Sequence, residues 1–202
     1  RISIVVSRNP YSGCVRDSRV LCQSISRNDL TRIIERFQKH LRSFRFADSL
    51  GKVSFFEIYT ALAFKYFLDK KVDYAIFETG LGGRLDATNV VNPKVSVITH
   101  IGYDHTKILG DTISSITKEK CGIVKKGVPV VCSYQKKEAL RVIKDKCQKS
   151  KSQLYILGRD FKTDSLRFGK KYTKFNFNFG KFKIRNIQIP LLGSYQADNA
   201  AC

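Results

Sequence analysis

The fold is decided by the stretch ETGLGGRLDATN at residues 78–89, which follows the continuous apolar run VDYAIF at 72–77. A second apolar run, VSVI at 95–98, precedes the polar stretch THIGYDHT at 99–106. Continuous apolar runs of this length are typical of strands covered on both faces in a parallel sheet. Acids and a histidine that follow such strands lie where an open α/β sheet builds its ligand crevice. The sequence therefore predicts a magnesium–phosphate site at this edge of the sheet.

The pattern around this stretch alternates between strands and helices. Strands are predicted at 72–78, 95–99, 127–132 and 153–157, and helices at 54–68, 111–124 (capped by Asp111) and 139–148. This alternation predicts an α/β fold with a doubly wound, mostly parallel sheet. From Thr173 the sequence changes to phenylalanines alternating with asparagines, followed by an apolar run. It predicts an antiparallel hairpin, turning at Gly180-Lys181, appended to the parallel core.

The N-terminal part carries weaker signals. The first 27 residues read as irregular, with a turn at 9–13. A helix is predicted after Asn28 or Asp29 as N-cap, with one apolar face formed by Leu30, Ile33, Ile34, Phe37 and Leu41. A capping box is predicted at Ser54 and Glu57, in which each side chain bonds a free amide of the first turn. The body of that helix, 58–68, is apolar nearly all round and is expected to be largely buried.

Composition excludes some classes of protein. A length of 202 residues, with 43% hydrophobic and 27% charged residues, suits one soluble α/β domain. No apolar run approaches the roughly 20 residues that span a bilayer, and no signal peptide is evident. The six cysteines show no C-x-x-C pair, which favours reduced thiols and a cytoplasmic location.

The formal net charge of +20 is the strongest signal in the composition. Such a surface attracts polyanions, including nucleic acid, nucleotides and acidic substrates. The lysines alternate with aliphatic residues instead of forming one block, which favours solvated helix and strand faces over a dedicated nucleic-acid patch. We therefore expect no nucleic-acid partner and no membrane.

Four residues of the central stretch could carry chemistry, and each also has a structural interpretation. Glu78 could bind a metal or cap the amides of the glycine-rich loop. His105 could be a ligand or a structural loop residue, and Lys120 could be functional or a solvated cation. Asp86 could contact a ligand or form an Asx turn. The glycine pattern alone is weak, because it matches neither G-x-G-x-x-G nor a Walker loop.

The combination of these residues is more specific. The spacings are eight residues from Glu78 to Asp86, 27 from Glu78 to His105 and 15 from His105 to Lys120. Together with LDATN, DHT and ILGDT, they resemble the central domain of folylpolyglutamate synthase/dihydrofolate synthase, in the Mur ligase superfamily. The resemblance extends through residues 54–133, and a second matching segment covers residues 190–201. The block GLGGRLDATN resembles the folate branch more than the cell-wall ligases.

The resemblance implies an enzyme, an ATP-dependent carboxylate–amine ligase. A carboxylate of folate or dihydropteroate would take the γ-phosphoryl group of ATP, and the amine of L-glutamate would attack the acyl phosphate. Because negative charge gathers on phosphate oxygens, catalysis would depend on positioning and electrostatic stabilisation by Mg²⁺.

Roles for individual residues are also implied by the resemblance. Glu78 and His105 would hold Mg²⁺, and Lys120 would bind a second Mg²⁺ if it is carbamylated. These three are the expected catalytic residues. Asp86 matches a position that contacts the pterin in some members, and Asn199 matches a residue that touches adenine.

The sequence also departs from the family pattern. A phosphate loop with glycines and lysine would precede residue 1, and a C-terminal ligase domain would follow Cys202. A serine that binds magnesium cannot be assigned safely to Ser7, and a histidine expected before Gln196 is Tyr195. The chain, 1–202, is therefore expected to be a partial central domain, inactive alone.

The favoured prediction is a folylpolyglutamate synthase, with dihydrofolate synthase activity left open. One alternative is a cell-wall Mur ligase, and another is a non-catalytic basic relative that binds polyanions. Expected partners are small molecules (folate or dihydropteroate, L-glutamate and ATP), and the protein is expected to be monomeric and cytoplasmic.

Overall fold

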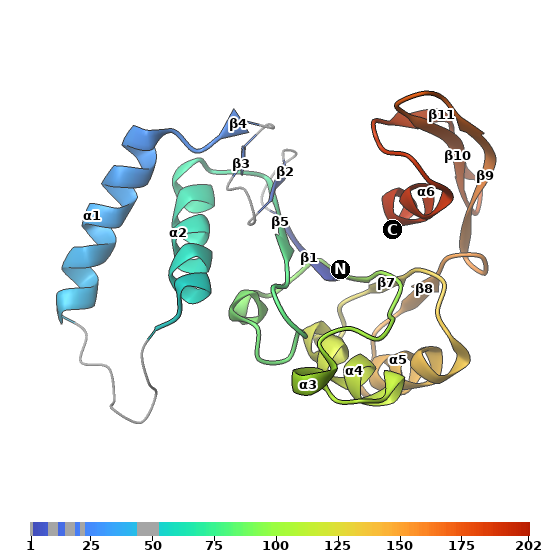
Figure 1. Cartoon of the computed structure of the whole chain (residues 1–202), viewed down its shortest axis with the longest axis horizontal. Coiled ribbons are helices and arrows are strands. Elements are labelled where there is room, and N and C mark those ends of the chain that lie inside the picture. The colour runs from blue at the N-terminus through green and yellow to red at the C-terminus, as the bar shows by residue number, and fades with distance from the viewer. Residues whose placement is uncertain (1, 8–11, 15–18, 21–22, 44–52) are drawn as a thin grey trace.

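Two β-sheets organise the chain in the computed structural model, which describes residues 2–7, 12–14, 19–20, 23–43 and 53–202 (Figure 1). The strands of the larger sheet are β1 (Ile2–Ser7), β2 (Ser12–Cys14), β3 (Arg19–Val20), β4 (Gln23–Ser24), β5 (Tyr74–Glu78), β6 (Val95–Ile98), β7 (Val130–Cys132) and β8 (Leu154–Ile156). The smaller sheet contains β9 (Phe161–Phe168), β10 (Thr173–Phe179) and β11 (Phe182–Ile189).

Helices flank the larger sheet. The α-helices are α1 (Arg27–Ser43), α2 (Phe55–Asp69), α3 (Thr106–Leu109), α4 (Ile113–Lys120), α5 (Lys137–Lys149) and α6 (Ser194–Ala201), and two 3₁₀ turns are η2 (Ala87–Val90) and η3 (Cys121–Ile123). In Figure 1, α1 and α2 stand side by side, α3 to α5 lie together below the central strands, and α6 packs on the smaller sheet. No helix among the described residues is long and apolar enough to cross a membrane.

Strand directions in the larger sheet confirm the mostly parallel arrangement. The strand order is β4-β3-β2-β5-β1-β6-β7-β8. β2 is parallel to β5, and β6, β7 and β8 are parallel to one another. β1 runs antiparallel to both β5 and β6, so these two strands point the same way. The carboxyl ends of β5 and β6 therefore lie at one edge, where the two polar loops begin.

The expectation of an irregular N-terminus is wrong for the described residues. β1 takes a central place in the sheet, and residues 12–13 belong to β2 instead of a turn. Residues 9–11 of the predicted turn lie outside the described ranges. β1 pairs with residues 67 to 96 positions away in the chain, and local turn signals do not reveal such a long-range contact.

α1 begins earlier than the sequence indicates. Ser26 accepts a hydrogen bond from the backbone N–H of Asp29 at 3.0 Å, so the cap is Ser26 and neither Asn28 nor Asp29. The carboxylate of Asp29 instead pairs with Arg32 and Lys70, at 2.8 and 2.9 Å. The pKa of Asp29 is lowered, chiefly by the hydrogen bond from Lys70. Ile33 is buried as predicted, whereas the side chain of Leu41 lies outside the described side chains.

α2 confirms both the capping box and the largely buried helix body. The backbone N–H of Glu57 donates to Ser54 Oγ at 3.2 Å, and that of Ser54 donates to Glu57 Oε2 at 2.7 Å. One face of the helix is buried through Leu62, Ala63, Tyr66 and Phe67. Tyr59 and Leu68 are exposed, whereas the other residues of 58–68 are buried or half-buried, so the expectation of a largely buried helix body is confirmed. Apolar residues on its outer face add to the exposed surface.

Two further boundaries differ from the prediction. The N-cap of α4 is Thr112 and not Asp111, because Thr112 Oγ1 accepts the N–H of Ser115 at 3.0 Å. The antiparallel hairpin of β10 and β11 is confirmed, but β9 pairs with the other edge of β10 and makes a three-stranded sheet. The sequence of β9, FKTDSLRF, mixes charged and apolar residues and gives little local signal.

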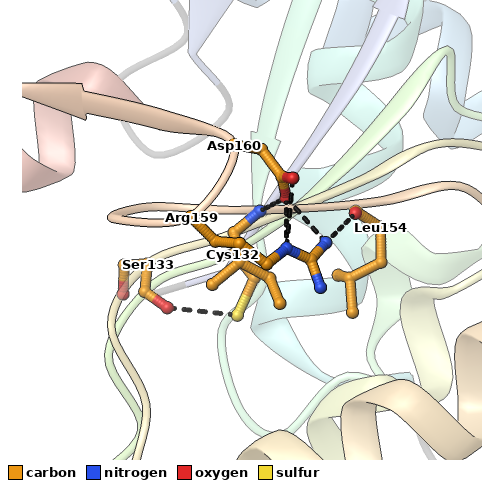
Figure 2. Close-up of polar contacts among 6 residues, drawn as sticks. Cys132, Ser133, Leu154, Arg159 and Asp160 are labelled. Carbon is orange, nitrogen blue, oxygen red and sulfur yellow. Dashed lines mark hydrogen bonds and ion pairs between the residues drawn. The ribbon is translucent and has the colours of Figure 1, made fainter. Parts of the chain in front are cut away.

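A polar turn connects the two sheets after β8 (Figure 2). Asp160 Oδ2 accepts the N–H of Ile156 at 2.7 Å, and Arg159 Nη2 donates to the carbonyl oxygen of Leu154 at 2.9 Å. Arg159 also pairs with Asp160 at 2.7 Å. This turn fixes the direction in which the chain enters β9.

The four cysteines whose side chains the structure describes are free thiols. Cys121, Cys132 and Cys147 are buried in the core, and Cys202 is half-buried. Burial raises the pKa of Cys121 to about 12 and that of Cys132 to about 11, so both thiols stay protonated. The expectation of reduced cysteines is confirmed for these four residues.

Candidate active site

The glycine-rich loop after β5 is shaped by the carboxylate of Asp86. Asp86 Oδ2 accepts the backbone N–H groups of Gly80 at 2.8 Å and Leu81 at 3.0 Å. Asp86 Oδ1 accepts the N–H of Thr88 at 2.9 Å. Asp86 is buried, so these bonds satisfy a carboxylate that has little access to water. The structural interpretation of Asp86 is therefore correct, and its expected contact with a pterin stays a prediction.

The loop packs closely on the end of α4. The backbone N–H of Arg84 donates to the carbonyl oxygen of Glu119 at 2.9 Å. A Cβ atom added to Gly83 would lie 2.7 Å from the carbonyl oxygen of Lys120, and one added to Gly122 would lie 2.2 Å from Arg84 Cα. Both glycines are needed because the two backbones touch.

Asn89 joins the C-terminal end of the glycine-rich loop to the segment that follows α4. Its Nδ2 donates to the carbonyl oxygens of Arg84 and Gly122, at 3.0 and 3.2 Å. Lys125 Nζ donates to the backbone oxygen of Asn89 at 2.8 Å. The loop from 80 to 89 and the segment from 119 to 125 therefore form one hydrogen-bonded unit.

Glu78 lies at the carboxyl end of β5, immediately before this loop, and is half-buried. It lines a cavity of about 370 Å³ together with Phe55, Phe56, Tyr59, Thr60, Thr79 and Gly80. Thr60 is buried, and its Oγ1 makes no hydrogen bond within the described part of the chain. The site thus combines aromatic walls with a carboxylate and a hydroxyl group.

His105 has an unusual backbone conformation. Its φ of 49° and ψ of 39° lie in the left-handed region, which few residues other than glycine adopt and which histidine tolerates better than most. Its carbonyl oxygen accepts the N–H groups of Ile108 and Leu109, at 2.9 and 3.0 Å. Such conformations cluster at functional sites. The imidazole is about half exposed, and its Nε2 lies 3.6 Å from Asp104 Oδ1.

The His105 loop is held from two sides. The side-chain amide of Gln135 brackets the preceding backbone, accepting the N–H of Ile101 at 3.0 Å and donating to the oxygen of Thr99 at 2.8 Å. On the other side, Leu109 packs against Gly82, since a Cβ atom there would lie 3.0 Å from Leu109 Cδ2. The loop that carries His105 therefore contacts the glycine-rich loop.

Lys120 ends α4 against the glycine-rich loop and is half-buried. Burial lowers the pKa of its amine, and the negative charge of Asp104 partly offsets this shift. A lowered pKa raises the neutral fraction of the amine, which is its nucleophilic form. Asp104 is thus electrostatically coupled to Lys120 and also lies beside His105.

A second and larger cavity, of about 620 Å³, opens beside the loop. Its lining comes from α2, the loop, α3 and the end of α4, namely Ser54, Phe56, Glu57, 80–87, Ile108, Leu109 and Glu119. A volume of this size suits a small-molecule ligand. The two cavities share Phe56 and Gly80, so the loop forms a wall of both.

The structure brings together the elements that carry Glu78, His105 and Lys120, because each element contacts the glycine-rich loop. The structure does not place Asn199 beside the glycine-rich loop. Asn199 is exposed on α6, which packs on β9 and β10, and its Nδ2 lies 3.5 Å from Gln196 Oε1. Among the described residues, no three His, Cys, Asp or Glu side chains form a metal-binding group.

Sequence reasoning missed four residues of this site. Asp104 lies beside His105, Gln135 braces the loop before it, and Arg84 pairs with Glu119 at 3.0 Å. Asp104 and Arg84 stand inside the motifs DHT and GLGGRLDATN, which gave an available signal, and Glu119 directly precedes Lys120. Gln135 lies 30 residues from His105 in the chain, and no local pattern connects the two.

Comparisons with known proteins agree on one family. A sequence model of the Mur ligase middle domain matches residues 49–202. The chain is 39% identical over 181 residues to a dihydrofolate synthase/folylpolyglutamate synthase of Bacillus subtilis (strain 168), a match that covers 88% of the chain and 41% of that protein.

Solved structures give the same result. A mutant of the L. casei FPGS (folylpolyglutamate synthase) matches with a TM-score of 0.82 and 32% identity, covering 95% of this chain and 49% of that one. An FPGS–AMPPCP–folate complex matches with a TM-score of 0.77 and 29% identity, covering 99% and 49%. The chain therefore spans less than half of each of these three proteins.

Proposed function

Because the chain belongs to the Mur ligase family through its middle domain, we propose that the complete protein is an ATP-dependent ligase that adds glutamate to folate. The observation that carries this proposal is the packing of three elements, those bearing Glu78, His105 and Lys120, on one glycine-rich loop. The relatives reported above, which are named as folylpolyglutamate or dihydrofolate synthases, favour the folate branch over a cell-wall ligase. Dihydrofolate synthase activity is a second use of the same site.

The proposed reaction has two steps. A folate carboxylate oxygen attacks the γ-phosphorus of ATP, forming an acyl phosphate and ADP. The amine of glutamate then attacks the acyl carbon, loses a proton, and expels inorganic phosphate as the amide forms. One matching structure is a complex with the ATP analogue AMPPCP and folate, which supports these substrates for the complete protein.

Magnesium would be held by Glu78 and His105. Mg²⁺ prefers oxygen ligands and usually keeps several waters beside one or two side chains and the substrate phosphates. Glu78 offers a carboxylate oxygen at a strand end, and the accessible imidazole of His105 would be a less usual nitrogen ligand, with water and phosphate oxygens at the remaining positions. Bound Mg²⁺ would neutralise charge that develops on the transferred phosphoryl group.

Lys120 would act as a carbamate. The neutral amine attacks CO₂, and loss of one proton leaves an anionic carbamate that can bind a second Mg²⁺. The lowered pKa of Lys120 supports this role because it favours the neutral amine. Asp86 would contact the pterin while it shapes the loop, and Asn199, in the second half of α6, would touch adenine.

The test uses the full-length protein. We expect phosphate release that requires ATP, glutamate and a folate together, and a loss of at least about 100-fold in kcat for Glu78→Gln. Activity on uridine-linked muramyl acids but not on folates would contradict the proposal in favour of a cell-wall ligase. Tight, salt-dependent RNA binding without turnover would favour a non-catalytic polyanion-binding protein. Cytoplasmic location and a monomeric state stay predictions.

A further inference from the structure

We propose that Arg84 and Glu119 form a positioning pair, which sets the place of Lys120 relative to the glycine-rich loop. The inference rests on the proposed function only for the chemical role of Lys120. The placement itself can be measured without catalysis. Arg84 lies in the loop and Glu119 directly precedes Lys120 on α4.

The two residues are joined through both side chains and backbones. Arg84 Nε donates to Glu119 Oε1 at 3.0 Å and to Oε2 at 3.2 Å. The backbone N–H of Arg84 donates to the carbonyl oxygen of Glu119 at 2.9 Å. Because Arg84 and Glu119 are joined by both side chains and backbones, the loop can neither rotate freely against the end of α4 nor move away from it.

The restraint reaches Lys120 through backbone contact. Gly83 lies so close to the carbonyl oxygen of Lys120 that a Cβ atom there would be only 2.7 Å away. A shift of Glu119 away from Arg84 would therefore open the contact between Gly83 and Lys120. The amine of Lys120 would then gain water, and its distance from Glu78 at the other end of the loop would change.

Stability alone does not account for this arrangement. The Arg84 side chain is 56% exposed and that of Glu119 is 30% exposed. Ion pairs at such exposed sites contribute at most about 1 kcal/mol to folding. A misplacement of about 1 Å in an active site, however, can lower a rate by about 100-fold. We therefore expect the main effect of the pair on catalytic geometry.

The experiment compares three variants of the full-length protein. Arg84→Met and Glu119→Gln break the pair, and Arg159→Met breaks a comparable ion pair at the turn after β8 (Figure 2). Steady-state kinetics give kcat and the KM for each substrate. Trace acetylation in bicarbonate-free buffer, read by mass spectrometry at Lys120, gives the pH midpoint of the amine.

We expect kcat to fall at least about 10-fold in Arg84→Met and Glu119→Gln, with each KM within about 2-fold of wild type. We expect the acetylation midpoint of Lys120 to rise in both, because the amine becomes more hydrated. Arg159→Met should change neither quantity, and Arg84→Lys should recover part of kcat by restoring one donor.

Two results would overturn the inference. One is an unchanged midpoint in Arg84→Met and Glu119→Gln, and the other is an equal loss of kcat in Arg159→Met. A raised midpoint in a protein without ligase turnover would support the positioning of Lys120, while it would contradict the proposed function. The two hypotheses are thus tested separately.

Discussion

The glycine-rich loop and the smaller sheet differ in how far their charged residues are exposed to water. In the loop, Asp86 accepts backbone N–H groups and Arg84 pairs with Glu119, so charged groups hold segments together that are distant in sequence. On the smaller sheet, Lys162 on β9 and Lys183 on β11 flank Asn178 of β10, so two like charges lie on either side of one polar residue. Asp164 bonds Asn176 and Asn178 between neighbouring strands, but these lysines lie at exposed positions, whereas the charged groups of the loop join segments that are distant in sequence.

The exposure of the lysines on the smaller sheet also helps to explain how the chain carries a net charge of +20. The lysines of β9 and β11 lie at exposed positions, where water and salt screen their repulsion. The expectation of solvated faces is in accord with this placement, whereas the absence of a nucleic-acid partner stays a prediction.

The largest effect is expected from Gly122→Ala in the full-length protein. The new Cβ atom would lie 2.2 Å from Arg84 Cα, so the backbone of the loop must move. We expect the unfolding free energy to fall by about 1–3 kcal/mol and kcat to fall about 100-fold. Denaturant titration and steady-state kinetics measure the two quantities.

Gly102→Ala is the matched control for this substitution. No heavy atom lies within 4 Å of a Cβ atom added there, and Gly102 is not in the left-handed region. We expect its unfolding free energy to stay within about 0.5 kcal/mol of wild type. Equal losses in the two alanine variants would show that close packing is not the cause.

A smaller loss is expected for Asp86→Asn. The amide replaces one acceptor oxygen with a donor that faces backbone N–H groups, so at least one buried bond is lost. We expect a decrease of about 1–2 kcal/mol in the unfolding free energy. Asp164→Asn on the smaller sheet should cost less, because Asp164 bonds only side chains of a partly exposed face. The reverse order would contradict the contrast between the regions.

Lys120→Met should show a pH-dependent difference from wild type. The folded pKa of Lys120 lies below 10.5, so the unfolded chain binds more protons between the two values. Wild-type stability therefore rises with pH in that window, while the variant lacks this rise. We expect Lys120→Met to be more stable than wild type at neutral pH, and this difference to shrink as the pH rises toward 10.5 in denaturant titrations.

Lys70→Met provides the opposite case. The hydrogen bond to Asp29 raises the pKa of Lys70, so its contribution persists up to 10.5 and is lost only above that value. We expect the difference between Lys70→Met and wild type to be constant between pH 7 and 10. If the stability difference between Lys70→Met and wild type changed with pH as it does for Lys120→Met, the cause would be the net charge of the whole protein and not the burial of Lys120.

The smallest effect is expected for Lys162→Gln or Lys183→Gln. Each removes one of two like charges that flank Asn178 across adjacent strands. We expect a gain of at most about 0.5 kcal/mol in the unfolding free energy. The gain should be larger at 0.01 M than at 0.15 M salt, because screening weakens the repulsion. A loss at low salt would contradict the interpretation of this face.

Local patterns in the sequence predicted the elements that depend on neighbours in the chain. The capping box of Ser54 and Glu57 needs only four consecutive residues, and the strand ending at Glu78 is marked by its apolar run. The hairpin of β10 and β11 follows from alternation. These features could be located before any packing was known.

Features that depend on distant segments were not predictable in this way. β9 forms because β10 offers a free edge, and the pair of Arg84 and Glu119 forms because the loop folds onto α4. The sequence left open whether Asp86 contacts a ligand or forms an Asx turn. Its hydrogen bonds to the loop amides support the structural role. The family resemblance pointed to Lys120, but the burial that lowers its pKa is a property of packing.

The contact between Gly122 and Arg84 makes the loop and the end of α4 move as one body. Neither side can slide past the other, because no gap separates their main chains. A molecule that enters the larger cavity and pulls on the loop must therefore also pull on Lys120. Occupancy of that cavity should slow amide hydrogen exchange at 119–122, even where the bound molecule touches none of those amides.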